Sequence, residues 1–137
     1  MLIRCRGWNE NKNIMYSPEV MATDQLTLMP DGSGFINVSG DSTRLSQFLR
    51  HIKPVFFTGL RDKNGKEIYE GDLLGGTWGD GYIGYCDKCK SFEYFSTVFS
   101  CMACEGDVTW RELVENDGKL EVIGNIYESS NLLDTKT

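Results

Sequence analysis

The chain has few of the sequence features that membrane-spanning proteins and nucleic-acid-binding proteins need. It contains no run of about 18 apolar residues, which a membrane-spanning helix requires. It has only 14 basic residues against 20 acidic ones, so its formal net charge is −6 at pH 7. Proteins that neutralise many phosphates instead carry clustered Lys and Arg. We therefore expect no membrane span and no non-specific nucleic-acid interface.

Residues for hydrolytic catalysis are also scarce. His51 is the single histidine, and no serine lies in a nucleophile-elbow setting, so a Ser–His–Asp triad cannot be assembled. The glycine-rich stretch 75–84 has no lysine and no following helix, which excludes a phosphate-binding loop. The first residues lack the apolar core of a secretory signal, so we expect a cytoplasmic location. These absences predict a protein that is not an enzyme.

What the chain does have is hydrophobic content for a core, 40% of its residues, arranged mostly in β-type patterns. The alternation and the apolar runs predict strands at 2–6, 14–16, 35–38, 55–60, 67–74, 108–114 and 120–127. Polar and glycine-containing turns are expected at 9–13, 30–34, 62–65 and 116–118. One helix is expected at 43–52, since Leu45, Phe48, Leu49 and Ile52 recur at helical spacing before Pro54.

Four cysteines form the sharpest chemical pattern. Cys86-x-x-Cys89 is followed after eleven residues by Cys101-x-x-Cys104, and segment 90–100 can turn back as a hairpin. Two such pairs can converge tetrahedrally on one ion, and four thiolates leave no open position for water or substrate. We predict a structural Zn²⁺ bound by these four residues. Disulfides or free thiols are less favoured in a reducing cytoplasm, and iron is a further alternative.

Other polar residues have weaker functional interpretations. Cys5 lies alone in an alternating strand, where a buried inert thiol is expected. An acidic cluster of Asp62, Glu67, Glu70 and Asp72 could in principle hold a divalent cation. However, Asp62 suits a hairpin turn, and Glu70 and Asp72 flank a bend at a glycine. A structural role is the favoured interpretation of the cluster.

Three stretches indicate a family. They are IRCRGWNENKNIM at Ile3–Met15, FFTGLRDKNGKEIYEGDLL at Phe56–Leu74 and EVIGNIYESSNLL at Glu121–Leu133. Together they resemble the YopX family, small proteins encoded by temperate phages and prophages, which has no established biochemical function. The double CxxC departs from the general pattern of that family. We therefore interpret 85–107 as a zinc-ribbon-like insertion.

These observations combine into one expected architecture. The fold class is mostly β (α+β), with a small SH3-like antiparallel barrel over 55–137 and an embedded zinc-knuckle hairpin. Residues 1–54 supply N-terminal strands and a helix that pack on the barrel. Ile68, Val122 and Ile126 are expected in the core.

The leading hypothesis is a phage or prophage accessory protein that binds another protein and uses zinc as a scaffold. Self-association as a dimer is also expected from a surplus of aromatic residues, namely Phe56, Phe57, Trp78, Tyr82 and Phe95. The first alternative is a nucleic-acid-associated regulator, since small barrels and zinc ribbons often touch DNA or RNA. The second is a metal-dependent enzyme that uses the Glu70 and Asp72 carboxylates.

Overall fold

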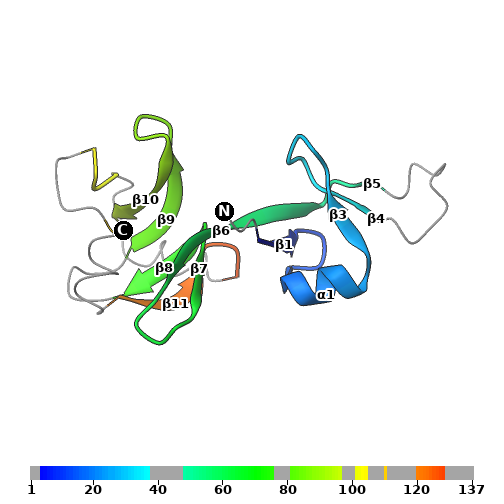
Figure 1. Cartoon of the computed structure of the whole chain (residues 1–137), viewed down its shortest axis with the longest axis horizontal. Helices are drawn as coiled ribbons and strands as arrows, with labels where there is room; N and C mark the ends of the chain where they lie inside the picture. The colour runs from blue at the N-terminus through cyan, green and yellow to red at the C-terminus, as the bar shows by residue number, and fades with distance from the viewer. Residues whose placement is uncertain are drawn as a thin grey trace. The chain divides into compact units, whose positions relative to one another are not determined.

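A computed structural model describes residues 4–37, 48–75, 81–96, 101–104, 110 and 120–128. The described chain is mostly antiparallel β-structure with one short helix, α1, as the sequence predicts (Figure 1). It divides into two compact units, Met1–Phe56 and Phe57–Thr137, and strand β6 (Ile52–Arg61) contributes to both. No helix among these described residues is long and apolar enough to cross a membrane. The packing of the N-terminal part on the barrel stays a prediction.

The first unit contains two small sheets and the helix. Its elements are β1 (Cys5–Asn9), β2 (Ile14–Tyr16), α1 (Pro18–Thr23), β3 (Leu26–Leu28), β4 (Phe35–Asn37) and β5 (Phe48–Leu49). Strand β1 lies between β2 and β6, and β4 lies between β3 and β5, all antiparallel. Met21, Phe35 and Ile52 form the core of this unit. The turn predicted at 30–34 is confirmed, and the one predicted at 9–13 is confirmed for 10–13. The first strand begins at Cys5 and ends at Asn9, three residues later than expected.

The helix lies elsewhere than the sequence pattern predicts. The expected helix at 43–52 is wrong over its described part, because Phe48–Leu49 form β5 and β6 starts at Ile52. Leu49 and Phe48 instead pair with Phe35 and Ile36 of β4, so their apolar side chains serve a sheet. Residues 43–47 lie outside the described part of the chain.

The observed helix α1 has a start signal that the sequence analysis missed. The Ser17 side chain accepts a hydrogen bond from the Val20 N–H at 3.2 Å, and Pro18 occupies the first helical turn. Ser followed by Pro and Glu is a typical helix start, because the cap satisfies a free N–H and Pro has none to satisfy. At six residues the helix is too short to show an apolar periodicity.

The second unit is a curled antiparallel half-barrel. Besides β6, its strands are β7 (Glu67–Tyr69), β8 (Asp72–Gly75), β9 (Gly81–Cys86), β10 (Ser91–Ser96) and β11 (Glu121–Asn125). The larger sheet has the order β10-β9-β8-β11, and β7 pairs with β6. The turn at 62–65 is confirmed, and the strand expected at 67–74 is divided by a turn at Glu70–Gly71.

The core of this unit consists of six buried hydrophobic residues. They are Ile68, Leu74, Ile83, Tyr94, Trp110 and Leu120. The strand expected at 108–114 is wrong at Trp110, whose backbone is helical; the other residues of that range lie outside the described part. Trp110 contributes its side chain instead, since its indole N–H donates to the Phe92 carbonyl at 2.8 Å. Of the expected core residues, Ile68 is fully buried, while Val122 and Ile126 are half-buried.

Gly71 explains the bend between β7 and β8. Its φ of 82° lies in the left-handed region, which favours glycine. A Cβ atom there would lie 2.6 Å from a ring carbon of Tyr127. Its N–H donates to the Ile83 carbonyl and its carbonyl accepts from the Ile126 N–H. The glycine therefore allows three segments of the second unit to approach closely at one point.

Candidate metal centre

The first cysteine pair lies in the turn of the β9–β10 hairpin. Strand β9 ends at Cys86 and β10 begins two residues after Cys89. The Lys90 N–H donates to the Cys86 carbonyl at 2.8 Å, and the Cys89 N–H points at the Cys86 sulfur at 3.5 Å. Lys90 adopts a φ of 57°, which turns the chain back into β10. This backbone geometry places both sulfurs of the pair on the same side of the turn.

The second pair is fixed by its contact with β10. Cys101 forms an isolated antiparallel bridge with Phe95, and the Met102 N–H donates to the Tyr94 carbonyl at 3.0 Å. One hairpin therefore positions all four cysteines, because β10 connects to the first pair through its turn and contacts the second pair through its backbone. The sequence prediction that segment 90–100 turns back is confirmed for 90–96; residues 97–100 lie outside the described part.

The four sulfurs converge as a tetrahedral site requires. All of them lie within 4.8 Å of one another. The Cys86–Cys104 distance is 3.4 Å, Cys89–Cys104 is 3.5 Å and Cys89–Cys101 is 3.9 Å. Four sulfurs at about 2.3 Å from one zinc ion would lie roughly 3.8 Å apart. A disulfide needs about 2.05 Å, and all five cysteines are free. The cluster can therefore hold a metal ion.

The pKa values of the clustered thiols are shifted in different directions. Hydrogen bonding from the backbone N–H of Cys89 lowers the pKa of Cys86 to about 7. Hydrogen bonding with Cys104 raises the pKa of Cys89, and hydrogen bonding with Cys86 raises the pKa of Cys104. One thiolate is thus stabilised by its neighbours, while further ionisation is opposed. A divalent cation would stabilise the remaining thiolates and displace their protons.

The arrangement favours a structural centre over a catalytic one. Cys86 and Cys101 are buried, Cys89 is half-buried and only Cys104 is exposed. Four thiolates fill a tetrahedral coordination shell, so such a centre has no position for water. Cys5 does not join the cluster; it is half-buried, and burial raises its pKa, which keeps it a neutral thiol.

Two carboxylates of the acidic cluster, those of Asp62 and Asp72, accept hydrogen bonds from backbone N–H groups of the second unit. Asp62 is 7% exposed and accepts hydrogen bonds from the N–H groups of Asn64, Lys66 and Val122, each at 2.9 Å. Asp72 is fully buried and accepts from the Tyr69 N–H at 2.8 Å. Among the residues that the structure describes, only the four cysteines gather as a metal-binding group. Both aspartates therefore stabilise turns, as the favoured interpretation predicted.

We expect Asp62→Asn to lower the free energy of unfolding by about 1–3 kcal/mol, because an amide cannot accept all three N–H bonds. Burial alone would raise the pKa of Asp62, but the N–H bonds from Val122, Lys66 and Asn64 outweigh it and lower the pKa. The contribution of this carboxylate is complete above the unfolded pKa, about 3.9, and is lost as the pH falls through the lower folded value.

Urea unfolding at pH 7 and pH 3 measures this effect. Asp31→Asn is the matched control, because a single oxygen of exposed Asp31 accepts both hydrogen bonds from Ser33, and an amide oxygen can do the same. The structural interpretation fails if Asp62→Asn is as stable as Asp31→Asn at pH 7.

The hairpin that carries the first cysteine pair is rich in aromatic side chains. Tyr82 stacks on Phe95 with ring centroids 5.3 Å apart, and Tyr85 meets Phe92 edge-on at 5.7 Å. Tyr94 is buried in the core, whereas Tyr85 is 52% exposed. A cavity of about 550 Å³ lies beside the cysteines, with Tyr85 and Phe95 in its lining.

These features define a small β-rich protein with a closed, all-cysteine site that can hold a metal ion. The chain belongs to the YopX family, because the family model described as "YopX protein" matches residues 4–134. The resemblance seen in three sequence stretches is thus confirmed. No curated protein matches the chain.

A solved structure supports the fold. The crystal structure of protein EF1440 from Enterococcus faecalis is similar to this chain with a TM-score of 0.59 and 23% sequence identity. The match covers 97% of this chain and 99% of that one. At this identity the likeness shows a shared fold and carries no argument about activity.

Proposed function

We propose that this YopX-family protein is a phage or prophage accessory protein of the bacterial cytoplasm that acts by binding another protein and not by catalysis. One observation carries the proposal: on the hairpin that holds the first cysteine pair, a half-exposed tyrosine, Tyr85, stands beside a cavity that three of the cysteines also line. Rigid aromatic side chains of this kind are frequent anchors in protein interfaces. The centre itself would be the scaffold that orients this surface.

Zinc is the metal that the ligand set favours. Thiolates are soft ligands, and a tetrahedral four-cysteine site is typical of structural Zn²⁺. Three of the sulfur separations, 3.4, 3.5 and 3.9 Å, agree with that coordination. Cys86, Cys89, Cys101 and Cys104 would each bind the ion through Sγ. When bound, it would neutralise charge among the thiolates and hold the two pairs together.

A partner assay tests the proposed interface. Tagged wild-type protein should enrich a specific host or phage protein, and Tyr85→Ala should reduce that enrichment at least about tenfold while zinc content is unchanged. Phe48→Ala is the matched control, since Phe48 is an aromatic residue of similar exposure, 43%, in the first unit. Equal enrichment by wild type and Tyr85→Ala, or enrichment of nothing, would argue against the proposal.

Self-association is part of the same proposal. Of the aromatics that suggested it, Phe56, Phe57, Tyr82 and Phe95 are half-buried, and Trp78 lies outside the described residues. In the described part of the chain, the large apolar side chains that are exposed are different ones: Ile14, Val20, Phe48, Tyr85 and Ile123. Light scattering at micromolar concentration should give the mass of a dimer, and a monomer mass would contradict this part of the proposal.

A further inference from the structure

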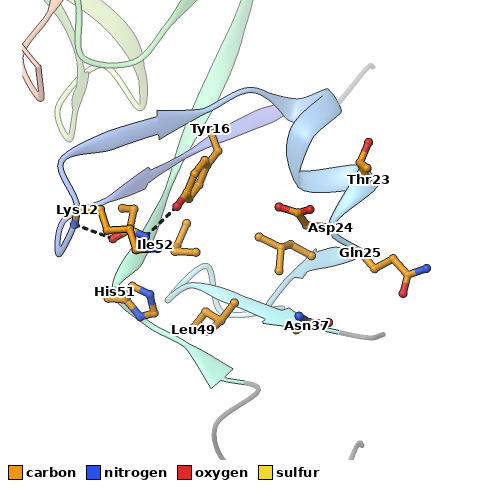
Figure 2. A pocket seen from close by; sticks show the side chains of 11 residues that line it. Lys12, Tyr16, Thr23, Asp24, Gln25, Asn37, Leu49, His51 and Ile52 are labelled. Carbon is orange, nitrogen blue, oxygen red and sulfur yellow. Dashed lines mark hydrogen bonds between the residues drawn. The ribbon is translucent and has the colours of Figure 1, made fainter. Parts of the chain in front are cut away.

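A cavity in the first unit has the size of a small-molecule site. Its volume is about 550 Å³, within the roughly 300–1,000 Å³ of typical ligand pockets. It is bounded by the β1–β2 hairpin, the end of α1 with the start of β3, strand β4 and the turn between β5 and β6 (Figure 2). Nothing in the family assignment or the cysteine centre accounts for it.

Part of the lining is apolar. Leu26, Leu49 and Ile52 contribute aliphatic side chains to the cavity. Ile52 is only 4% exposed and belongs to the core of the unit, and the two leucines pack against that core. A ligand with a hydrocarbon body could therefore bury it against a surface that the fold already holds in place.

The polar lining carries charges of both signs. Lys12 and His51 lie at one end of the cavity, and Asp24 lies across from them (Figure 2). Among the described residues, none of these three side chains has an ion pair or a hydrogen-bond partner. A purely anionic ligand would face Asp24 and a purely cationic one would face Lys12. Only a ligand with one positive and one negative group can place each of them beside a side chain of opposite charge.

The buried side-chain amide of Asn9, through its Oδ1 and Nδ2 atoms, holds one wall of the cavity in place. Asn9 is 3% exposed, and its carbonyl oxygen accepts hydrogen bonds from the N–H groups of Asn11 at 3.0 Å and Lys12 at 3.1 Å. Its Nδ2 donates to the Tyr16 hydroxyl at 3.1 Å. Because the Tyr16 oxygen accepts this bond, its own proton stays available to donate toward the cavity (Figure 2). The wall is thus held in one geometry before any ligand arrives.

We propose that this cavity binds a small zwitterion that has an ammonium group, a carboxylate and an apolar body, that is, a free amino acid or a short peptide with free ends. The Asp24 carboxylate binds the ammonium group. Lys12 and His51, with the Tyr16 hydroxyl beside them, bind the carboxylate. The apolar body lies against Leu26, Leu49 and Ile52.

A nuclear magnetic resonance titration of the full chain tests this assignment. The probes are L-leucine and trileucine, which distinguish an amino acid from a peptide, each compared with its N-acetylated and its C-amidated form. We expect saturable shifts of the Asn9 side-chain NH₂ signals with one of the two free zwitterions. Either blocked form should bind at least about tenfold more weakly, because it leaves one charged group of the cavity without its partner.

Variants then assign each end of the ligand. The Asp24→Asn variant should bind the free and the N-acetylated ligand with equal affinity. In the Lys12→Gln variant, the difference in affinity between the free and the C-amidated ligand should become smaller. Both residues are exposed, so we expect these substitutions to leave the fold intact. Asp31→Asn is the control, and it should still bind each blocked ligand more weakly than the free one. The proposal is overturned if neither zwitterion binds at millimolar concentration, or if blocked and free forms bind wild type equally.

Discussion

Ile68→Ala should lower the free energy of unfolding by about 2–5 kcal/mol, the range for deleting a buried isoleucine side chain. Ile68 is fully buried at the centre of the second unit, in contact with a cluster that includes Trp110 and Tyr94. The substitution leaves a cavity that these large rings cannot easily fill. Chemical denaturation followed by tryptophan fluorescence measures the change.

A less buried residue of the same unit provides the comparison. Val122 is half-buried and packs against the edge of the same core, so Val122→Ala should cost clearly less than Ile68→Ala. If the two variants lose equal stability, Ile68 is not at the centre of the core and the described packing of the second unit is wrong.

Cys101→Ser should abolish stable metal binding and loosen the β9–β10 hairpin locally. Cys101 supplies one sulfur and also holds its pair to β10 through the bridge to Phe95. Hydrogen exchange should accelerate over 85–107, while the core around Ile68 stays protected because it has its own apolar contacts. A chelator added to the wild type should produce the same local pattern.

One control separates the loss of a metal ligand from the loss of any thiol. Cys5→Ser should leave metal content and exchange unchanged, since Cys5 does not join the cluster. Global unfolding on chelation would contradict a centre that only fixes one hairpin. So would unchanged exchange over 85–107 in Cys101→Ser.

The sequence predicted those features whose cause is local. The turn at 62–65 contains Asp62, which accepts bonds from its own turn, and Gly65, whose φ is positive, so its residues determine its shape. The four-cysteine site was predictable for a similar reason. The two-residue spacing within each cysteine pair is local and lets both sulfurs face one point. The meeting of the two pairs also needs the contact of Cys101 with Phe95 of β10.

Features that depend on distant partners were not predictable. Phe48, Leu49 and Ile52 fit a helical stripe, but pairing of β5 with β4 places Phe48 and Leu49 in a strand. Ile52 begins β6, which pairs with β1. Likewise, the cavity of the first unit depends on three turns and a sheet that meet only in the folded chain. Lys12, Asp24 and His51 are far apart in sequence, and none lies in a motif that indicates a ligand.

Metal analysis of the protein purified under reducing conditions tests whether the four cysteines bind zinc. We expect one equivalent of zinc per chain, with Zn–S distances of about 2.3 Å from four sulfurs by X-ray absorption. Less than about half an equivalent of zinc in the wild type, or a disulfide between Cys86 and Cys89, would contradict this expectation.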